Sequence, residues 1–151
     1  MRSYDNIVIE FSNIFKADKT IQESLIPHFG IECGPGWSDI IYDLSKQISE
    51  WIENHPEHSE FYITQIKSKF ASLRCYSSVY IHEIEEMINA AEKKSAITCE
   101  ECGEPGATSG KGWLVCLCDK CRAEQVQEQE RKHKLYSQSP SPKGKGLNRE
   151  V

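Results

Sequence analysis

The stretch QIKSKFASLRCY, residues 65–76, decides the fold. It and its flanks are rich in Tyr, Ile, Phe and Val, so the pattern predicts an antiparallel hairpin over 61–79. Apolar residues at helical spacing predict an amphipathic helix on each side of the hairpin, over 37–54 and 79–94. These elements predict an α+β fold, a small antiparallel sheet packed by two helices. Residues 1–34 have no clean period, so helix and strand both remain open there.

The predicted hairpin gathers positive charge on one face. With the turn placed at 71–72, Lys69 lies opposite Arg74 and Lys67 lies opposite Tyr76. Like charges that face each other across two strands are unfavourable, so this face needs a partner of opposite charge. The opposite face, which carries Ile66, Phe70, Leu73 and Cys75, is suited to burial.

Two partners for the basic face remain open. The first is a set of carboxylates of the same domain, for which the candidates are Glu83, Glu86, Asp39 and Asp43. The second is a phosphate-bearing ligand, either a signalling nucleotide or a nucleic-acid segment. Lys67, Lys69 and Arg74 would then hold the phosphate, and Tyr76 or Trp37 would stack on a base.

Charge and hydropathy limit the class of protein. Residues 1–121 contain 11 Lys and Arg against 19 Asp and Glu, whereas residues 122–151 contain 7 against 4. An acidic body is a poor general binder of nucleic acid, so any anion site must be local. There is no run of 18 apolar residues and no signal-peptide pattern at the N-terminus, so we expect a cytoplasmic protein without a membrane partner.

The cysteines predict a metal site. Cys99 and Cys102 form one C-x-x-C pair, and Cys118 and Cys121 form a second pair after fifteen intervening residues. Four thiolates close the tetrahedral coordination sphere of Zn²⁺, so the spacing predicts a structural zinc site without an open position for water. Gly103 suits the positive φ that such a knuckle needs. A strand within WLVCL, residues 113–117, and a helix from 119 to 136 would complete a treble-clef arrangement.

The remaining cysteines are not expected to bind the metal. Cys116 lies on the strand before the second pair, where alternate side chains point apart, although it remains a possible substitute for Cys118. Cys33 and Cys75 are interpreted as small buried apolar residues.

The chain divides into four parts by composition. An α+β body over 1–95 precedes a zinc-binding module over 96–122. An exposed helical extension over 123–136 leads to a tail over 137–151, which is rich in Ser, Pro, Gly and Lys and is expected to be disordered.

Several motifs, in order, resemble a family of small uncharacterised proteins of phages and bacterial genomes. The motifs are GIECGPGW, KSKFASLRCY, AAEKKS, CEECGEPG, KGW and LCDKC, within about 30–122. The family has two glycines where this chain has Ala71 and Ser72. The resemblance implies a phage or prophage setting in a host cytoplasm, with a role in blunting host defence. Residues 97–126 are also locally similar to the zinc finger of the DksA/TraR-type regulators of RNA polymerase.

Three functions follow from these patterns. The first is a non-catalytic binding protein that holds an anionic small ligand or nucleic acid at the basic hairpin. The alternative is a module that docks on a host protein, an enzyme or a transcription complex, through the zinc finger and helix 119–136. An enzyme that uses Glu83, Glu85 and Glu86 ranks third, because the five histidines are scattered and no catalytic motif occurs. The oligomeric state stays open.

Overall fold

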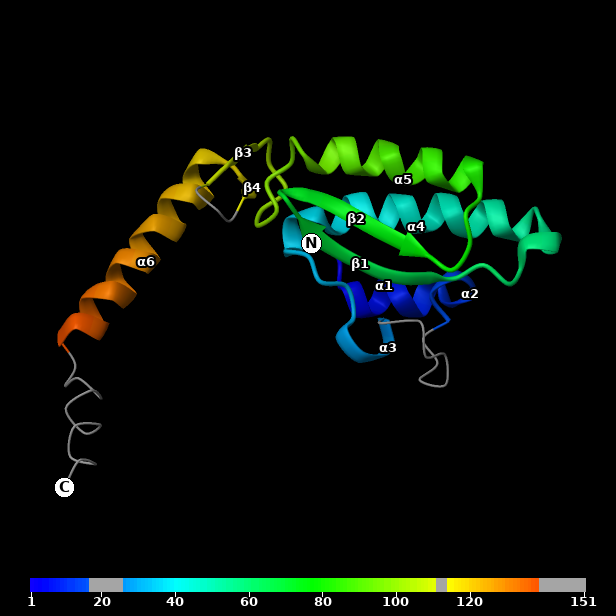
Figure 1. Ribbon diagram of the computed structural model, residues 1–151, viewed down its shortest axis with the longest axis horizontal. Coiled ribbons are helices and arrows are strands. Elements are labelled where there is room, and N and C mark those ends of the chain that lie inside the picture. Colours follow the sequence, from blue (N-terminus) through cyan, green and yellow to red (C-terminus); the bar gives the residue numbers. More distant parts are fainter. Residues whose placement is uncertain (17–25, 111–113, 139–151) are drawn as a thin grey trace, which may run out of the picture.

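The computed structural model describes residues 1–16, 26–110 and 114–138. Its fold is α+β, as predicted (Figure 1). Strands β1 (Ile63–Lys69) and β2 (Ser72–Ser77) form the antiparallel hairpin, and helices α4 (Ser38–Glu53) and α5 (His82–Ser95) pack along it.

In the described part of the N-terminal segment, which the sequence left open, the regular elements are helices, and Glu32 forms an isolated bridge with Lys67 of β1. The segment contains α1 (Tyr4–Glu10), α2 (Ser12–Phe15) and α3 (Ile26–Phe29), followed by a 3-10 turn, η1 (Pro35–Trp37). A second 3-10 turn, η2 (Pro56–His58), follows α4. The short helices contact α4 and β1 and close the core on the side away from α5 (Figure 1).

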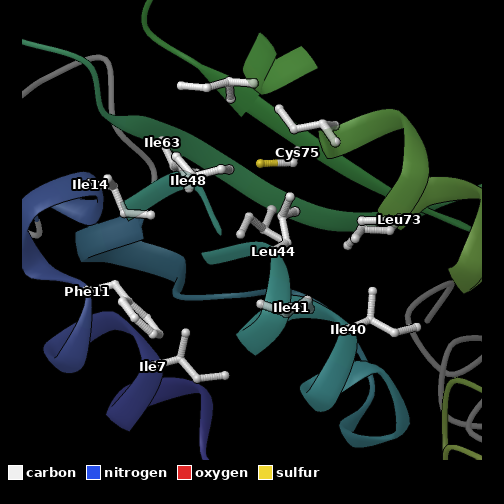
Figure 2. Close-up of a cluster of buried hydrophobic side chains, with 14 of the residues drawn as sticks. Ile7, Phe11, Ile14, Ile40, Ile41, Leu44, Ile48, Ile63, Leu73 and Cys75 are labelled. Atoms are coloured by element: carbon white, nitrogen blue, oxygen red, sulfur yellow. The ribbon is translucent and has the colours of Figure 1, made fainter. Parts of the chain in front are cut away.

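The core lies between the hairpin and α4. Ile41, Leu44 and Ile48 of α4 point toward Ile63 and Leu73 of the hairpin, and all five side chains are buried (Figure 2). Apolar side chains at helical spacing on one side and at alternate strand positions on the other therefore meet in one cluster.

The predicted register of the hairpin is wrong. The turn consists of Phe70 and Ala71, whose φ angles are 53° and 63°, so that Lys67 and not Lys69 faces Arg74. Tyr76 faces residue 65, and Phe70, predicted to be buried, is 67% exposed. The predicted and observed registers place the same residues on each face, because they differ by an even number of positions. Hydrophobic alternation therefore could not distinguish them.

The C-terminal part contains the predicted knuckle, strand and helix in that order. Strands β3 (Ala107–Ser109) and β4 (Val115–Leu117) pair, and α6 (Asp119–Gln138) begins next to the second cysteine pair. The start of the predicted strand, at 113, and residues 139–151 of the predicted tail lie outside the described residues. Among the described helices, none combines the length and apolarity needed to cross a membrane.

Candidate metal centre and the adjoining cleft

Four cysteines from two separate segments come together at the base of α6. Cys99 and Cys102 lie on the turn after α5, Cys118 directly precedes α6, and Cys121 lies in its first turn. Their sulfur atoms all lie within 4.8 Å of one another. In the described residues, no other group of three or more His, Cys, Asp or Glu brings its ligand atoms together in this way. The four thiols can hold a metal ion, and the donor set fits Zn²⁺.

The pKa values of these thiols shift in opposite directions. Burial raises the pKa of the Cys99 thiol, but backbone N–H groups, led by that of Cys118, outweigh it and lower the pKa to about 7. Hydrogen bonding to the Cys118 sulfur raises the pKa of Cys121. Since metal ligands must be thiolates, binding of a cation to this cluster releases protons.

The other three cysteines lie outside the cluster. The Cys116 thiol is buried, donates to the carbonyl oxygen of Ala96 at 3.3 Å and is not part of the group of four sulfur atoms. Burial raises the pKa of Cys75 to about 12 and raises that of Cys33 as well. Cys75 is buried as expected, whereas Cys33 is only partly buried. Neither is a ready nucleophile, because reactivity requires the thiolate.

The metal-binding turn is fastened to the body through Glu100, which lies between two of the ligands. Its carboxylate accepts from the N–H of Gly34 at 2.8 Å and from the hydroxyl of Ser68 at 3.0 Å. Its backbone carbonyl accepts from the N–H of Gly36 at 2.6 Å. The turn thereby bonds both to the segment before α4 and to β1.

Close backbone packing adds to these hydrogen bonds. A Cβ atom on Gly36 would lie 2.2 Å from the carbonyl oxygen of Cys99, a distance that no side chain can occupy. Gly103, with φ of 84°, takes the left-handed conformation predicted for the knuckle. The motifs GPGW and CEECG are therefore two halves of one contact.

The predicted ligand-binding residues do not form one site. The guanidinium of Arg74 pairs with the carboxylate of Glu92 at 3.1 Å, and not with any of the four carboxylates that the sequence suggested. Trp37 is fully buried and donates its indole N–H to the carbonyl oxygen of Thr98 at 2.9 Å. It is therefore not available to stack on a ligand. Tyr76 is partly exposed, and the Lys67 ammonium lies 5.9 Å from its ring centroid.

A cleft of about 640 Å³ lies between the hairpin tip and the cysteine module. The hairpin contributes Lys67, Lys69 and Phe70, and the module contributes Leu114, Val115 and Leu117. The lining is completed by Glu32, Ser68, Glu100, Glu101 and Gln125. The sequence pattern identified the two lysines but missed the apolar wall, because no local motif shows which part of the module faces the hairpin.

No family model, no curated protein and no solved structure matches this chain. The features of the described residues that bear on function are the group of four cysteines and the cleft.

Proposed function

We propose that this protein is a zinc-stabilised, non-catalytic protein-interaction module. Its partner inserts an apolar side chain into the cleft between the hairpin tip and the cysteine module, and further contacts involve α6. The observation that carries this proposal is that Phe70, a large apolar and exposed side chain, lines that cleft.

Phe70 combines exposure with a strained backbone. Its side chain is 67% exposed and its φ of 53° lies in the left-handed region. That conformation costs a non-glycine residue about 1–2 kcal/mol. A large apolar side chain that is both exposed and strained is typical of a functional position, and aromatic residues anchor protein interfaces. The apolar wall opposite Phe70 and the charges of both signs around it suit a protein segment.

Helix α6 provides the second contact surface. Every described side chain from 123 to 137 is exposed, and the helix has no apolar face. Arg122 fixes its first turn by donating from the guanidinium to the carbonyl oxygen of Ala107 at 2.7 Å. In Figure 1 the helix projects away from the body. A polar helix held at its base by a metal centre is well placed for a partner to bind along it.

The phage setting rests on the motif resemblance. On that basis the partner is a host protein, either an enzyme or a transcription complex, that the module inhibits or redirects, in the host cytoplasm. A role in blunting host defence belongs to the same hypothesis.

The second candidate function is binding of a phosphate-bearing ligand in the same cleft. It is supported by Lys67 and Lys69, which both line the cleft and have no carboxylate within ion-pair distance among the described residues. It is weakened by Arg74, whose charge is already matched by Glu92. The three acidic residues that line the cleft also oppose an anion.

A pull-down with the full, zinc-loaded chain tests the first candidate. Phe70→Ser should abolish capture of the partner from a bacterial lysate without lowering the melting temperature. Phe29→Ser is the matched control, because Phe29 is 64% exposed, lies on α3 and does not line the cleft. Truncation after residue 122 should weaken capture. Equal capture by the wild type and by Phe70→Ser would reject the cleft as the docking site.

Thermal-shift measurements with cyclic and linear nucleotides test the second candidate. A nucleotide that binds the native state raises the melting temperature in proportion to the logarithm of its concentration. Replacement of Lys67 and Lys69 by glutamine should remove that increase. If no nucleotide raises the melting temperature of the wild type, the ligand hypothesis fails while the interaction hypothesis is unaffected.

A further inference from the structure

Charge is distributed very unevenly along the chain. Residues 1–130 contain 12 Lys and Arg against 22 Asp and Glu, whereas residues 131–149 contain six Lys and Arg and no acidic residue. This basic run is a local polycation on an otherwise acidic protein. Its first part, RKHKLY over 131–136, belongs to the C-terminal half of α6 and is described by the structure.

The basic end of α6 is held away from the acidic body. In Figure 1 the helix projects away from the body, and all side chains from 131 to 137 are exposed. Arg131 lies ten residues after Cys121 of the metal centre, which corresponds to about 15 Å along the helix. Charges in solvent are largely screened from each other beyond about 8 Å at physiological salt, so the carboxylates of the body do not cancel this positive charge.

One carboxylate on α6 itself opposes the cations. Glu128 binds the guanidinium of Arg131 at 2.6 Å and lies 3.8 Å from the ammonium of Lys132. All three side chains are exposed, and exposed ion pairs are weak, so a phosphate group can compete for both cations. Lys134 has no carboxylate within ion-pair distance in the described part of the chain.

An exposed aromatic ring lies among these cations. Tyr136 is 75% exposed. Lys132 and Tyr136 are four residues apart, so they lie one turn apart on the same face of the helix. A strand whose phosphate contacts the Lys132 ammonium can therefore place a base on the Tyr136 ring. Cations that follow the backbone, combined with aromatic rings on which bases stack, are typical of proteins that bind single-stranded nucleic acid.

We propose that residues 131–136 of α6 bind single-stranded nucleic acid, with further charge supplied by the Lys and Arg residues of the tail. Arg131, Lys132 and Lys134 contact phosphates, and Tyr136 stacks on a base. An anionic membrane is a poorer partner because α6 has no apolar face to insert, and a duplex is poorer because its base faces are hidden in the stack. The site lies outside the cleft and does not depend on the proposed function.

Fluorescence anisotropy with labelled oligo(dT) and oligo(U) of about 20 nucleotides, longer than a usual single-strand site, tests the proposal on the full, zinc-loaded chain. Both oligonucleotides should bind, since phosphates and base faces are common to DNA and RNA. Tyr136→Ala should weaken binding about tenfold without changing its salt dependence, because it removes a stacking surface and no charge. Tyr80→Ala is the matched control and should bind like the wild type, because Tyr80 is 70% exposed but precedes α5.

Salt dependence tests the phosphate contacts. The logarithm of the binding constant should fall linearly with the logarithm of the salt concentration. Joint replacement of Lys132 and Lys134 by glutamine should reduce that slope by about 1.4, since each phosphate contact on a single strand contributes about 0.7. The same replacement of Lys93 and Lys94, two exposed lysines in the last turn of α5, should leave the slope unchanged.

Glu128→Gln provides a test of opposite sign. It releases Arg131 from its ion pair, so binding should become about threefold tighter, and Glu124→Gln, one turn earlier, should have a smaller effect. Absence of saturable binding at low salt, or equal binding by the wild type and by Tyr136→Ala, would overturn the proposal. Tighter binding to vesicles that contain phosphatidylserine than to either oligonucleotide would identify a membrane as the partner and would overturn it as well.

Discussion

Glu100 lies between two metal-binding cysteines, yet its side chain serves the body of the protein. Its carboxylate accepts hydrogen bonds from the N–H of Gly34 and from the hydroxyl of Ser68. Within the described residues, neither of these two groups donates to another acceptor. Its neighbour Glu101 is exposed and has no such bond. Two adjacent glutamates in one C-x-x-C turn therefore have different structural roles.

We predict that Glu100→Ala lowers the free energy of unfolding by about 1–3 kcal/mol, because it leaves partly buried donors unsatisfied. Urea denaturation of the zinc-loaded protein measures the effect. Glu101→Ala is the matched control and should change stability by less than about 0.5 kcal/mol. Equal effects of the two substitutions would mean that Glu100 does not fasten the turn to the body.

A second prediction at this scale concerns the ligand set. Elemental analysis of the wild type should give one zinc per chain, since four thiolates satisfy one tetrahedral ion. Cys118→Ser should lose most of the metal. Cys116→Ser should retain the metal, because the Cys116 thiol, two residues from Cys118, hydrogen-bonds to the carbonyl oxygen of Ala96. Metal loss in both variants to the same degree would contradict the assignment.

At the scale of elements, periodicity predicted which segments form helices and strands. The helices expected at 37–54 and 79–94 are α4 (38–53) and α5 (82–95), and the hairpin lies within 61–79. Apolar spacing carries this information because each of these elements buries one face. The described N-terminal helices have only seven, four and four residues, about two turns at most, so no apolar spacing repeats often enough there to identify a helix.

The turn was harder to predict than the strands. A two-residue turn with positive φ at both positions favours Gly or Asn, and the chain offers Phe70 and Ala71 instead. Tertiary packing outweighs that preference, since Ala71 is buried at 1% exposure. Tertiary packing also limits what can be predicted of the site. Spacing in the sequence identified the four cysteines, but the Arg74–Glu92 pair and the cleft depend on how distant elements meet.

We predict that Phe70→Asn raises the free energy of unfolding by about 1 kcal/mol. Asparagine tolerates the left-handed conformation better than phenylalanine, and an exposed ring contributes little burial. Thermal and urea denaturation measure the change. The same substitution at Phe29, on a short helix, should not stabilise the protein. A loss of stability in Phe70→Asn would show that the ring at the turn is structural.

At the scale of the whole molecule, the cysteine module and the body share one contact. Glu100 hydrogen-bonds to the body, and Gly36 packs directly against the backbone of Cys99. Trp37, at the start of α4, bonds to the carbonyl of Thr98 beside the first ligand. Loss of order at the metal centre therefore removes bonds on which the N-terminal end of α4 depends.

We predict that a strong zinc chelator lowers the stability of the body as well as that of the module. Metal binding is part of the folding free energy at such sites, so removal should lower the melting temperature of the whole chain. Hydrogen exchange at Ile41 and Leu44 in α4 should accelerate on chelation. Exchange confined to residues 96–122 would mean that the two parts fold independently.

The contact between Gly36 and Cys99 has a consequence for the life of the protein in a cell. If the body depends on a filled cysteine site, zinc starvation increases the fraction of open chains, and proteases act on that fraction first. The abundance of this protein should then follow the zinc supply of the cell, without any dedicated regulator.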